Sequence, residues 1–404
     1  MKTFIILTQY YPPETGAPQN RLHSLSKFLI RHGESVQVVT ALPNYPKNEI
    51  YPEYRKKFSV REIIDGVAVY RTWIFVSRSR SVLARLLNYF SFVITSFFAL
   101  LRQPKAEYVI CESPPLFLGL TAVFIAKIKG SRLVFNVSDL WPESAEKLQI
   151  ISSRSMIGLA YKLEKWIYNN SYMISGQTKG IVDNILARFP SKKVVWFPNG
   201  VDFDFFEGQQ EDFSWRKTLG ISETDFVLLY AGIIGHAQGL DVLLRAAEML
   251  RDQTVKFVIV GDGPEKENLV RMAAEKSLGN VIFQPNLQKA KIPSLIKACD
   301  AYIVPLKKLD LFKGAIPSKL FEPLALGKPI LLGVDGEARQ LFIEEGKSGL
   351  YFEPEDAAEL AERIKVLISD PELVVSLGEQ GQRYVKEHFD RQRIHEKFLL
   401  HLEA

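Results

Sequence analysis

The 404-residue sequence contains little cysteine and no cysteine pattern typical of a metal site. Its two cysteines, Cys111 and Cys299, lie far apart, and neither belongs to a Cys-x-x-Cys or Cys/His cluster. This spacing argues against a disulfide framework and against a zinc site. We therefore expect both thiols to be small core residues.

Several targeting and nucleotide-binding signals are also lacking. The apolar run Phe4–Leu7 is too short for the core of a signal peptide, which favours a cytoplasmic protein. The glycine-rich loop at residues 229–240 is not a Walker loop, because no Gly-Lys-Ser/Thr follows it. No short-period repeat is present, and no plausible loop carries an Asp-x-Asp metal motif. The net charge of +5 suits phosphate-bearing ligands or an anionic membrane but is no signature of nucleic-acid binding.

The composition and periodicity predict two doubly wound α/β domains. Hydrophobic residues make up 47% of the chain and charged residues 24%, as in folded globular proteins, and 404 residues exceed what one core usually supports. Short apolar runs alternate with amphipathic stretches, a pattern typical of parallel sheets, and the boundary falls near residue 198. The expected strands are Thr3–Thr8, Val36–Thr40, Tyr108–Cys111, Leu133–Val137, Tyr172–Ser175 and Val194–Phe197, then Phe226–Tyr230, Lys256–Val260, Val281–Phe283, Ala301–Val304 and Ile330–Leu332.

Residues 82–101 form a long apolar stretch with a single charge, Arg85. Its length would allow it to span a bilayer, but the expected strands on both sides belong to one sheet. Basic residues at both ends favour a helix that lies in the headgroup region of an anionic leaflet, and a buried core helix is the alternative. These basic residues are Arg78, Arg80, Arg85, Arg102 and Lys105.

Two loops of the first domain are candidate ligand sites. Gly16 and Ala17 precede the first helix, where backbone can approach a ligand and free N–H groups attract an anion; a plain turn is the alternative. Asp139 follows an apolar strand, at the edge where such sheets bind ligands. Its carboxylate could accept or orient the proton of a hydroxyl, or it could cap a helix that Pro142 enters.

Two loops of the second domain are rich in glycine. Gly232, Gly235 and Gly239 permit backbone amides to approach a diphosphate, to which His236 could add a donor unless it is only a surface histidine. The segment Gly261–Pro264 could admit a nucleobase or sugar, or form a simple Asp-Gly turn.

The segment from Gly314 to Pro329 carries the most chemistry. Ser318 is expected to cap a helix, which places Lys319 in the first turn, where a cation opposes the helix dipole unless an anion neutralises it. This mismatch suggests a phosphate. Glu322 stands where a capping box would place it, or its carboxylate accepts both ribose hydroxyls.

Taken in order, these segments resemble glycosyltransferase family 4, whose members are retaining enzymes with two Rossmann-like domains facing a cleft, the type B fold. The most specific matches are Pro317–Glu322 with Ala325–Pro329, then Asn199–Asp202 and Gly261–Pro264. Tyr230–Gly232 with Gln238–Leu240, and Asp139–Pro142, are similar to the subgroup that builds bacterial surface polysaccharides, including transferases of N-acetyl-L-fucosamine.

This resemblance implies an acceptor-binding domain over residues 1–197, a nucleotide-sugar-binding domain over 198–380, and a terminal helix, 381–404, that crosses back. Asp139, Lys319 and His236 are the expected catalytic residues. In the donor site Glu322 binds the ribose, Lys319 and the amides around Gly235 the diphosphate, and the backbone near Asn286 the base. The implied donor-binding residues are Gly16, Gly232, Gly235, His236, Gln238, Gly263, Pro264, Asn286, Leu287, Ser318, Lys319 and Glu322. The implied acceptor-binding residues are Ala17, Asn20, Asp139 and Trp141.

The sequence departs from the family pattern at two places. Gly314 stands where the first of two paired glutamates is usual, and Gly235-His236 and Gln238 stand where many relatives place an arginine and a lysine. The phosphate charge then falls more heavily on Lys319 and His236. Lys313 and Arg339 are further candidates for this role.

The resemblance implies transfer of a sugar from a UDP-linked donor, without metal or cofactor, to a polyprenyl-diphosphate-linked saccharide in O-antigen or capsule synthesis. It places the protein in the cytoplasm, peripheral on the inner face of the cell membrane through residues 82–101, with no nucleic-acid partner. One alternative is a non-hydrolysing epimerase of the same fold, whose acid-base carboxylates and histidines are not evident. The other is a catalytically silent nucleotide-sugar-binding partner of an assembly complex, which Gly314 keeps open.

Overall fold

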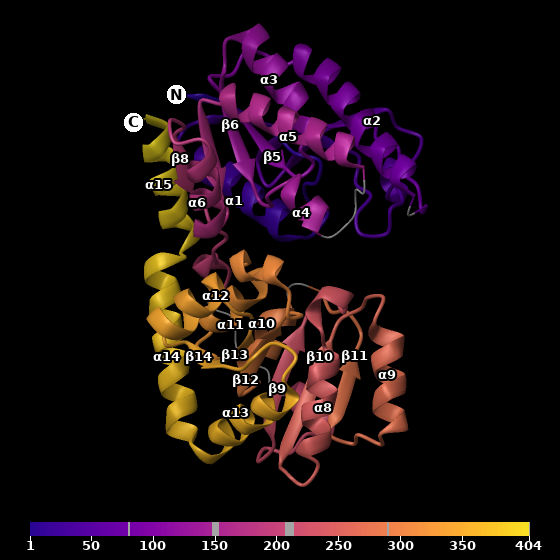
Figure 1. The fold of residues 1–404 in the computed structure, drawn as a ribbon, viewed down its shortest axis with the longest axis vertical. Coiled ribbons are helices and arrows are strands. Elements are labelled where there is room, and N and C mark those ends of the chain that lie inside the picture. The colour runs from indigo at the N-terminus through magenta and orange to yellow at the C-terminus, as the bar shows by residue number, and fades with distance from the viewer. Residues whose placement is uncertain (80, 148–152, 207–213, 289–290, 404) are drawn as a thin grey trace. The chain divides into compact units, whose positions relative to one another are not determined.

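The computed structural model describes residues 1–79, 81–147, 153–206, 214–288 and 291–403. The chain forms two compact units, one of Met1–Asn199 with Ile394–Ala404 and one of Gly200–Arg393 (Figure 1). Each unit contains a parallel sheet with helices on its faces, which confirms the expected pair of Rossmann-like α/β domains. The chain leaves the first unit after Asn199 and returns to it at Ile394, whereas the sequence put these points at 197 and 381.

The first unit is built on an eight-stranded sheet with the order β3-β4-β2-β1-β5-β6-β7-β8. Only β3 and β4 pair antiparallel; the other neighbours are parallel. This hairpin was not expected, because none of the β3 side chains is buried and the strand lacks an apolar run. The strands are β1 (Thr3–Leu7), β2 (Ser35–Ala41), β3 (Ser59–Ile64), β4 (Val67–Thr72), β5 (Tyr108–Ser113), β6 (Arg132–Val137), β7 (Met173–Gly176) and β8 (Val194–Trp196).

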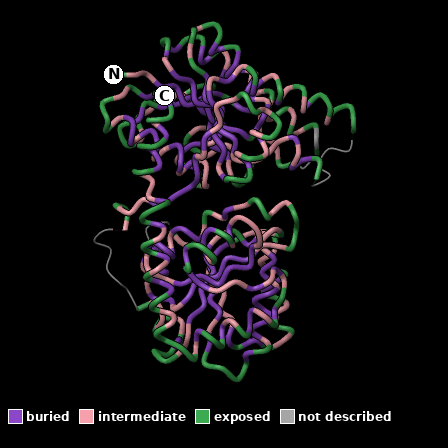
Figure 2. The backbone as a smooth tube through the Cα atoms, turned by 60° about the vertical axis from the view of Figure 1, so that its left-hand side comes forward, coloured by how far each residue is buried: buried purple, intermediate pink, exposed green. Residues whose placement is uncertain are grey.

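The second unit is built on a six-stranded parallel sheet with the order β11-β10-β9-β12-β13-β14. Its central strands are buried along nearly their whole length (Figure 2), as a sheet covered on both faces requires. The strands are β9 (Phe226–Ala231), β10 (Val255–Val260), β11 (Val281–Gln284), β12 (Ala301–Pro305), β13 (Ile330–Gly333) and β14 (Gly349–Tyr351). The short strand β14 was not expected.

Local capping explains where several helices begin. Asp356 accepts hydrogen bonds from the backbone N–H groups of Ala358 and Glu359, both at 3.0 Å, at the start of α13. The helices of the first unit are α1 (Ala17–Arg31), α2 (Val82–Leu101), α3 (Leu118–Lys129), α4 (Glu143–Lys147), α5 (Arg154–Asn169) and α6 (Lys179–Arg188). Those that follow are α7 (Ser214–Thr218), α8 (Asp241–Met249), α9 (Lys266–Glu275), α10 (Ile292–Lys297), α11 (Phe321–Ala325), α12 (Glu337–Arg339), α13 (Ala357–Ser369), α14 (Pro371–His388) and α15 (Arg391–Glu403).

Helix α2 is not the buried core helix that the sequence left as an alternative. Only 22% of the apolar stretch Leu83–Leu101 is buried inside the molecule, and this helix is long and apolar enough to cross a membrane by length and composition alone. One stripe, which includes Phe92 and Leu100, packs into the core. The opposite stripe is exposed and consists of Leu83, Leu87, Phe90, Ile94, Phe98 and Leu101. Of the flanking basic residues, Arg80 lies outside the described residues.

The C-terminal segment consists of two helices rather than the single helix expected over Glu379–Glu403. It breaks at Phe389 and Asp390, between α14 and α15. Helix α15 buries Ile394, Phe398 and Leu402 against strands of the first unit, with the Phe398 ring 4.3 Å from that of Phe197. Cys111 and Cys299 are both free and buried, as expected.

Candidate functional site

The loops that follow β9 and β10 lie against each other at the carboxyl edge of the second sheet. The Gly232 N–H donates to the Val260 carbonyl at 2.9 Å, and the Ile234 N–H donates to the Asp262 carbonyl at 2.9 Å. A Cβ at Gly261 would lie 1.9 Å from the Gly232 carbonyl oxygen. Gly261 therefore permits the contact between the two loops, a role that the sequence did not indicate.

Gly263, two residues after Gly261, also permits the contact between the β9 and β10 loops. Its φ is +155°, in a region that L side chains avoid, and a Cβ there would lie 2.3 Å from the Ile234 carbonyl oxygen. Pro264 follows as an exposed residue. Asn286 and Leu287 follow the neighbouring strand β11 after Pro285. Asn286 is exposed and Leu287 is half-buried. The structure thus places all four of these donor-site candidates at one edge of the sheet.

Lys319 points into the β9 loop. It lies in a short turn, Ser318–Leu320, directly before α11, and its Nζ is 4.3 Å from the centre of the Tyr230 ring and contacts the Tyr230 hydroxyl. A Cβ at Gly232 would lie 2.4 Å from Lys319 Cε, so a larger residue at this position would require the end of the lysine side chain to shift. Burial lowers the pKa of Lys319 to about 7. Loss of solvation therefore disfavours the charged form of this lysine.

Ser318 does not cap the helix as the sequence suggested. Pro317 occupies the cap position of the turn, no side chain accepts a capping hydrogen bond there, and Ser318 is the first residue of the turn. The chain passes from this turn into α11 without a break, so the turn needs no serine cap. Ser318 is exposed and Lys319 remains within the first turn.

Glu322 lies in the first turn of α11 and is half-buried. It contributes to the raised pKa of Tyr302, of which burial is the main cause. The Tyr302 hydroxyl donates to the Ala231 carbonyl at 2.8 Å, at the end of β9. Glu322 is therefore close to the same strand end as Lys319.

The turn Gly235–Gly239 precedes α8. The Gly235 N–H donates to Gln238 Oε1 at 3.1 Å, which holds the turn closed, and Gly239 has a left-handed φ of +57°. His236 is 74% exposed and its Nδ1 lies 2.7 Å from Glu265 Oε1. A phosphate bound at His236 would therefore compete with a carboxylate.

A recess of about 500 Å³ lies next to this turn, at the carboxyl ends of β12, β13 and β14. Its cations include Lys307, whose backbone N–H donates to the Ala237 carbonyl at 2.9 Å, and Lys313, which pairs with Asp310 at 2.8 Å. A Cβ at Gly314 would meet nothing within 4 Å. The sequence feature that could have indicated this recess is the Lys307-Lys308 pair, which follows an apolar strand after one residue. This pair was not singled out from the sequence.

Arg339, the other cation proposed from the sequence, is engaged by carboxylates. Its guanidinium lies 3.5 Å from Asp335 and 3.0 Å from Glu344, and it stacks 4.2 Å from the centre of the Tyr351 ring. Among the residues that the structure describes, no three His, Cys, Asp or Glu side chains gather where they could hold a metal ion.

In the first unit, Asp139 follows β6 at the carboxyl edge of the sheet. Its Oδ1 accepts a hydrogen bond from the Ser144 hydroxyl at 2.5 Å, and burial raises the pKa of its carboxyl group. Helix α4 begins only at Glu143, so Asp139 is not its cap. The Trp141 ring lies 5.7 Å from that of Phe117, which begins α3.

Gly16, Ala17 and Asn20 lie at the start of α1, after β1. Gly16 is the cap residue of the helix, with an extended φ of 171° and no side-chain cap, and the Asn20 N–H donates to its carbonyl at 3.0 Å. Gly16, Ala17 and Asn20 are all half-buried. Their carboxyl-edge position is the one that ligands of such sheets use.

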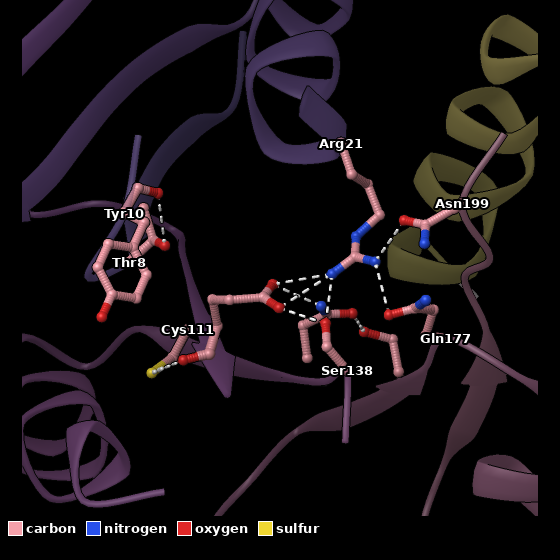
Figure 3. Close-up of polar contacts among 10 residues, drawn as sticks. Thr8, Tyr10, Arg21, Cys111, Ser138, Gln177 and Asn199 are labelled. Carbon is pink, nitrogen blue, oxygen red and sulfur yellow. Dashed lines mark hydrogen bonds and ion pairs between the residues drawn. The ribbon is translucent and has the colours of Figure 1, made fainter. Parts of the chain in front are cut away.

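A buried polar network joins these two parts of the first unit, and the sequence did not reveal it. Arg21 Nη2 donates to both carboxylate oxygens of Glu112, at 2.9 and 3.1 Å, and to the Ser138 hydroxyl at 2.6 Å (Figure 3). Arg21 Nη1 donates to the side-chain oxygen of Asn199 at 2.8 Å. Because Ser138 precedes Asp139 and Arg21 follows Asn20, the network fixes both candidate acceptor segments relative to each other.

Two family models match the chain, one for each half. The description "Glycosyl transferase 4-like domain" matches residues 16–200, and "Glycosyl transferases group 1" matches residues 211–384. A relative in Escherichia coli strain K12, provisionally named a colanic acid biosynthesis glycosyl transferase, is 28% identical over 99% of both chains. An O-antigen chain mannosyltransferase of Escherichia coli is 22% identical, over 96% of this chain and 94% of its own.

Solved structures share the fold. The crystal structure of the Anabaena protein HepE in complex with UDP and glucose covers 100% of both chains with a TM-score of 0.72 at 16% identity.

Proposed function

We propose that the chain, whose two halves match a glycosyl transferase 4-like domain and glycosyl transferases group 1, is a glycosyltransferase that moves a sugar from a UDP-linked donor to a lipid-linked saccharide. The product is part of an O-antigen, capsule or similar surface polysaccharide. The names of the relatives in colanic acid and O-antigen synthesis support this assignment.

The single observation that carries the donor site is the position of Lys319. Its ammonium group lies in the β9 loop, against Gly232 and the Tyr230 ring, and its lowered pKa reflects lost hydration. A diphosphate in that loop restores the missing electrostatic partner, and Glu322, at the same strand end, accepts the ribose hydroxyls. The UDP and glucose bound to the Anabaena neighbour support a uridine donor.

We assign the chemistry to charge stabilisation rather than to a covalent residue. As the bond between sugar and phosphate breaks, Lys319 and backbone N–H groups of the β9 loop stabilise the leaving diphosphate. Retention of configuration at the anomeric carbon requires the acceptor hydroxyl to approach from the side on which the diphosphate leaves. An oxygen of the leaving phosphate then takes the proton of that hydroxyl. Asp139 and Trp141 orient the acceptor, and the reaction requires no bound metal. We propose N-acetyl-L-fucosamine or a related amino sugar as the donor sugar, because Tyr230–Gly232 with Gln238–Leu240, and Asp139–Pro142, resemble the motifs of such transferases.

We place the protein on the cytoplasmic face of the cell membrane. The exposed apolar stripe of α2 is flanked by Arg78, Arg85, Arg102 and Lys105, an arrangement that suits an anionic leaflet. This position brings the enzyme to an acceptor carried on polyprenyl diphosphate.

Turnover of radiolabelled UDP-sugars on membranes tests the function. We expect transfer of label to the lipid fraction for one donor, and loss of transfer in Lys319→Ala by at least about a hundredfold, the typical loss when one transition-state donor is removed. The matched control is Lys347→Ala, an exposed lysine of the same unit, which should retain activity. Full activity in Lys319→Ala would refute the assignment.

Membrane recovery tests the location separately. Ile94 and Phe98 are 57% and 54% exposed on α2, and Ile94→Glu with Phe98→Glu should move the protein from the membrane fraction to the supernatant. The control Val375→Glu changes an exposed apolar residue on α14 and should leave recovery unchanged. Equal recovery of all three proteins would count against membrane contact through α2.

The two alternatives have less support. Both matching family models describe transferases, which does not favour an epimerase. A catalytically silent binding partner would bind UDP-sugar but give no labelled product with any donor or acceptor.

A further inference from the structure

A second concave site in the first unit lies away from Asp139, at the carboxyl ends of β2 and β4. Its cavity is about 390 Å³, and Trp73, the residue directly after β4, forms one wall. The segment Tyr54–Phe58, between β2 and β3, forms most of the rest. None of these residues belongs to the donor or acceptor set described above.

Three consecutive cations, Arg55, Lys56 and Lys57, line this cavity. Within the described parts of the chain none of them pairs with a carboxylate: Arg55 reaches only the Ile50 carbonyl, at 3.5 Å, and Lys57 lies 5.8 Å from the centre of the Tyr54 ring. The nearby Glu62 is already engaged by Arg71 and by the Tyr54 hydroxyl. The cavity therefore carries a concentrated positive charge with no internal counterion.

Lys56 also has a left-handed backbone, with φ of +62°. This conformation costs free energy for a residue with a Cβ and is commonly retained where a site requires it.

An apolar platform lies beside the cations. The rings of Phe58 and Trp73 are nearly parallel, with an angle of 7° between them and centroids 6.4 Å apart. Phe58 is 68% exposed and Trp73 is 38% exposed, so the pair offers ring faces to a ligand instead of filling the core. A ligand that suits both the three cations and the ring pair carries a multiply charged anion next to an apolar chain or a ring.

The position of the cavity further limits the class of ligand that it can bind. The Trp73 carbonyl accepts a hydrogen bond from the Thr95 hydroxyl of α2 at 2.7 Å, so the cavity adjoins the helix that we place at the membrane. Strand β6, which Asp139 follows, is four strands away from β4 in the sheet, or about 19 Å at the usual strand spacing. A ligand in the cavity is thus remote from the reacting hydroxyl but close to the bilayer.

We infer that this cavity binds the diphosphate of the lipid-linked acceptor, with the first prenyl unit against Phe58 and Trp73, while the far end of the saccharide reaches Asp139. The inference rests on the proposed function, since it requires an acceptor carried on polyprenyl diphosphate. The cations bind a diphosphate that is distinct from the donor diphosphate at Lys319. A glycan of several sugars then extends along the carboxyl edge of the sheet from β4 to β6.

Farnesyl diphosphate is a suitable probe, because it has the diphosphate and prenyl units without saccharide. We expect one molecule to bind the full-length protein in calorimetry in addition to UDP. The variant Arg55→Gln with Lys56→Gln and Lys57→Gln should weaken this binding at least about tenfold and leave UDP affinity unchanged, because charge-assisted hydrogen bonds carry most of the recognition. Trp73→Ala should weaken it as well. The control variant changes three exposed lysines elsewhere on the same unit, Lys47, Lys162 and Lys397, to Gln and should bind like the wild type.

Two results would overturn the inference. One is equal binding of farnesyl diphosphate to the wild type and the triple cation variant. The other is selective loss of binding to phosphatidylglycerol vesicles in that variant, with farnesyl diphosphate binding intact, which would assign the cavity to bulk phospholipid. In either case, continued transfer of labelled sugar to lipid would leave the proposed function standing, whereas absence of transfer with every donor would remove that function itself.

Discussion

At the scale of single residues, Lys319 is a candidate binding residue because its environment disfavours its charged form. The side chain is packed against Gly232 and the Tyr230 ring, and its lowered pKa records that the charged form is poorly solvated. A hydrophobic side chain of similar length would fill the same space without this penalty. The cation is therefore best explained by an anion that arrives with a ligand.

The affinity for UDP should depend on pH through this lysine. A bound diphosphate favours the ammonium form and raises the pKa of Lys319 above its value of about 7 in the free protein. Binding then takes up a proton, so affinity should be highest below pH 7 and fall by up to about tenfold per pH unit above it. Calorimetry between pH 6 and pH 9 measures this slope.

The variant Lys319→Met serves as the control for this slope. It should bind UDP weakly, with only the pH dependence of the nucleotide itself. If the wild type and the variant had the same pH profile, Lys319 would not be the group that titrates.

Arg21 and Glu112 illustrate the opposite case, a buried pair that is already complete. Arg21→Met leaves the Glu112 carboxylate buried without its partner, so we expect the first unit to lose about 3–5 kcal/mol of unfolding free energy. The exposed pair Arg271–Glu275 provides the control, and Arg271→Met should cost less than about 1 kcal/mol. Urea unfolding followed by a probe in the relevant unit measures both. A small loss in Arg21→Met would mean that Glu112 becomes protonated or hydrated without its partner.

The sequence suggested Lys319 as a candidate site residue but did not indicate the Arg21 network, for a physical reason. Lys319 lies in a contiguous motif with a cation at a helix start, and this local conflict can be read from neighbouring residues. Arg21 and Glu112 are separated by 91 positions and meet only because α1 begins, and β5 ends, at the same edge of the sheet. Likewise, Ser318 was assigned as a cap from its neighbours, whereas the actual turn continues directly into α11.

At the scale of elements, the apolar strands were the easiest to predict. Strands such as β9 and β10 are buried in the middle of a parallel sheet, so their sequences are nearly continuous apolar runs. The β3–β4 hairpin escaped prediction because β3 is an edge strand with no buried side chain. The contact between the β9 and β10 loops could not be predicted either, since glycine in a turn does not reveal what lies against it.

That loop contact should be sensitive to a single methyl group. Gly261→Ala places a Cβ 1.9 Å from the Gly232 carbonyl oxygen at a φ of +149°, and we expect a loss of about 2–4 kcal/mol in the second unit. The loops must separate, so UDP binding should weaken as well. In Gly279→Ala the new Cβ meets nothing within 4 Å, and stability should change by less than about 1 kcal/mol. Equal melting temperatures for the two variants would show that the loops separate without cost.

At the scale of the whole molecule, the chain builds one unit, then the other, and finishes on the first. Helix α15 lies against the first unit (Figure 1). Its residues Ile394, Phe398 and Leu402 belong to the core that also contains Phe4 and Val38. The Leu402 carbonyl accepts a hydrogen bond from the Tyr108 hydroxyl at 3.0 Å. The first unit is therefore incomplete until the last residues of the chain have been added.

This arrangement predicts that a change in the last helix destabilises the first unit and spares the second. Phe398 is buried, so Phe398→Ala leaves a cavity in the first unit and should cost it about 3–5 kcal/mol. Leu400 lies on the same helix but is 64% exposed, and Leu400→Ala should cost less than about 1 kcal/mol. On the proposal that UDP binds the second unit, UDP stabilises that unit by mass action, so scanning calorimetry with and without UDP should identify its transition. In Phe398→Ala the UDP-insensitive transition should shift to lower temperature while the UDP-sensitive transition keeps both its midpoint and its response to ligand. If the UDP-sensitive transition shifted instead, the final helix would be stabilising the donor-binding unit, and the division of the chain at Ile394 would be wrong.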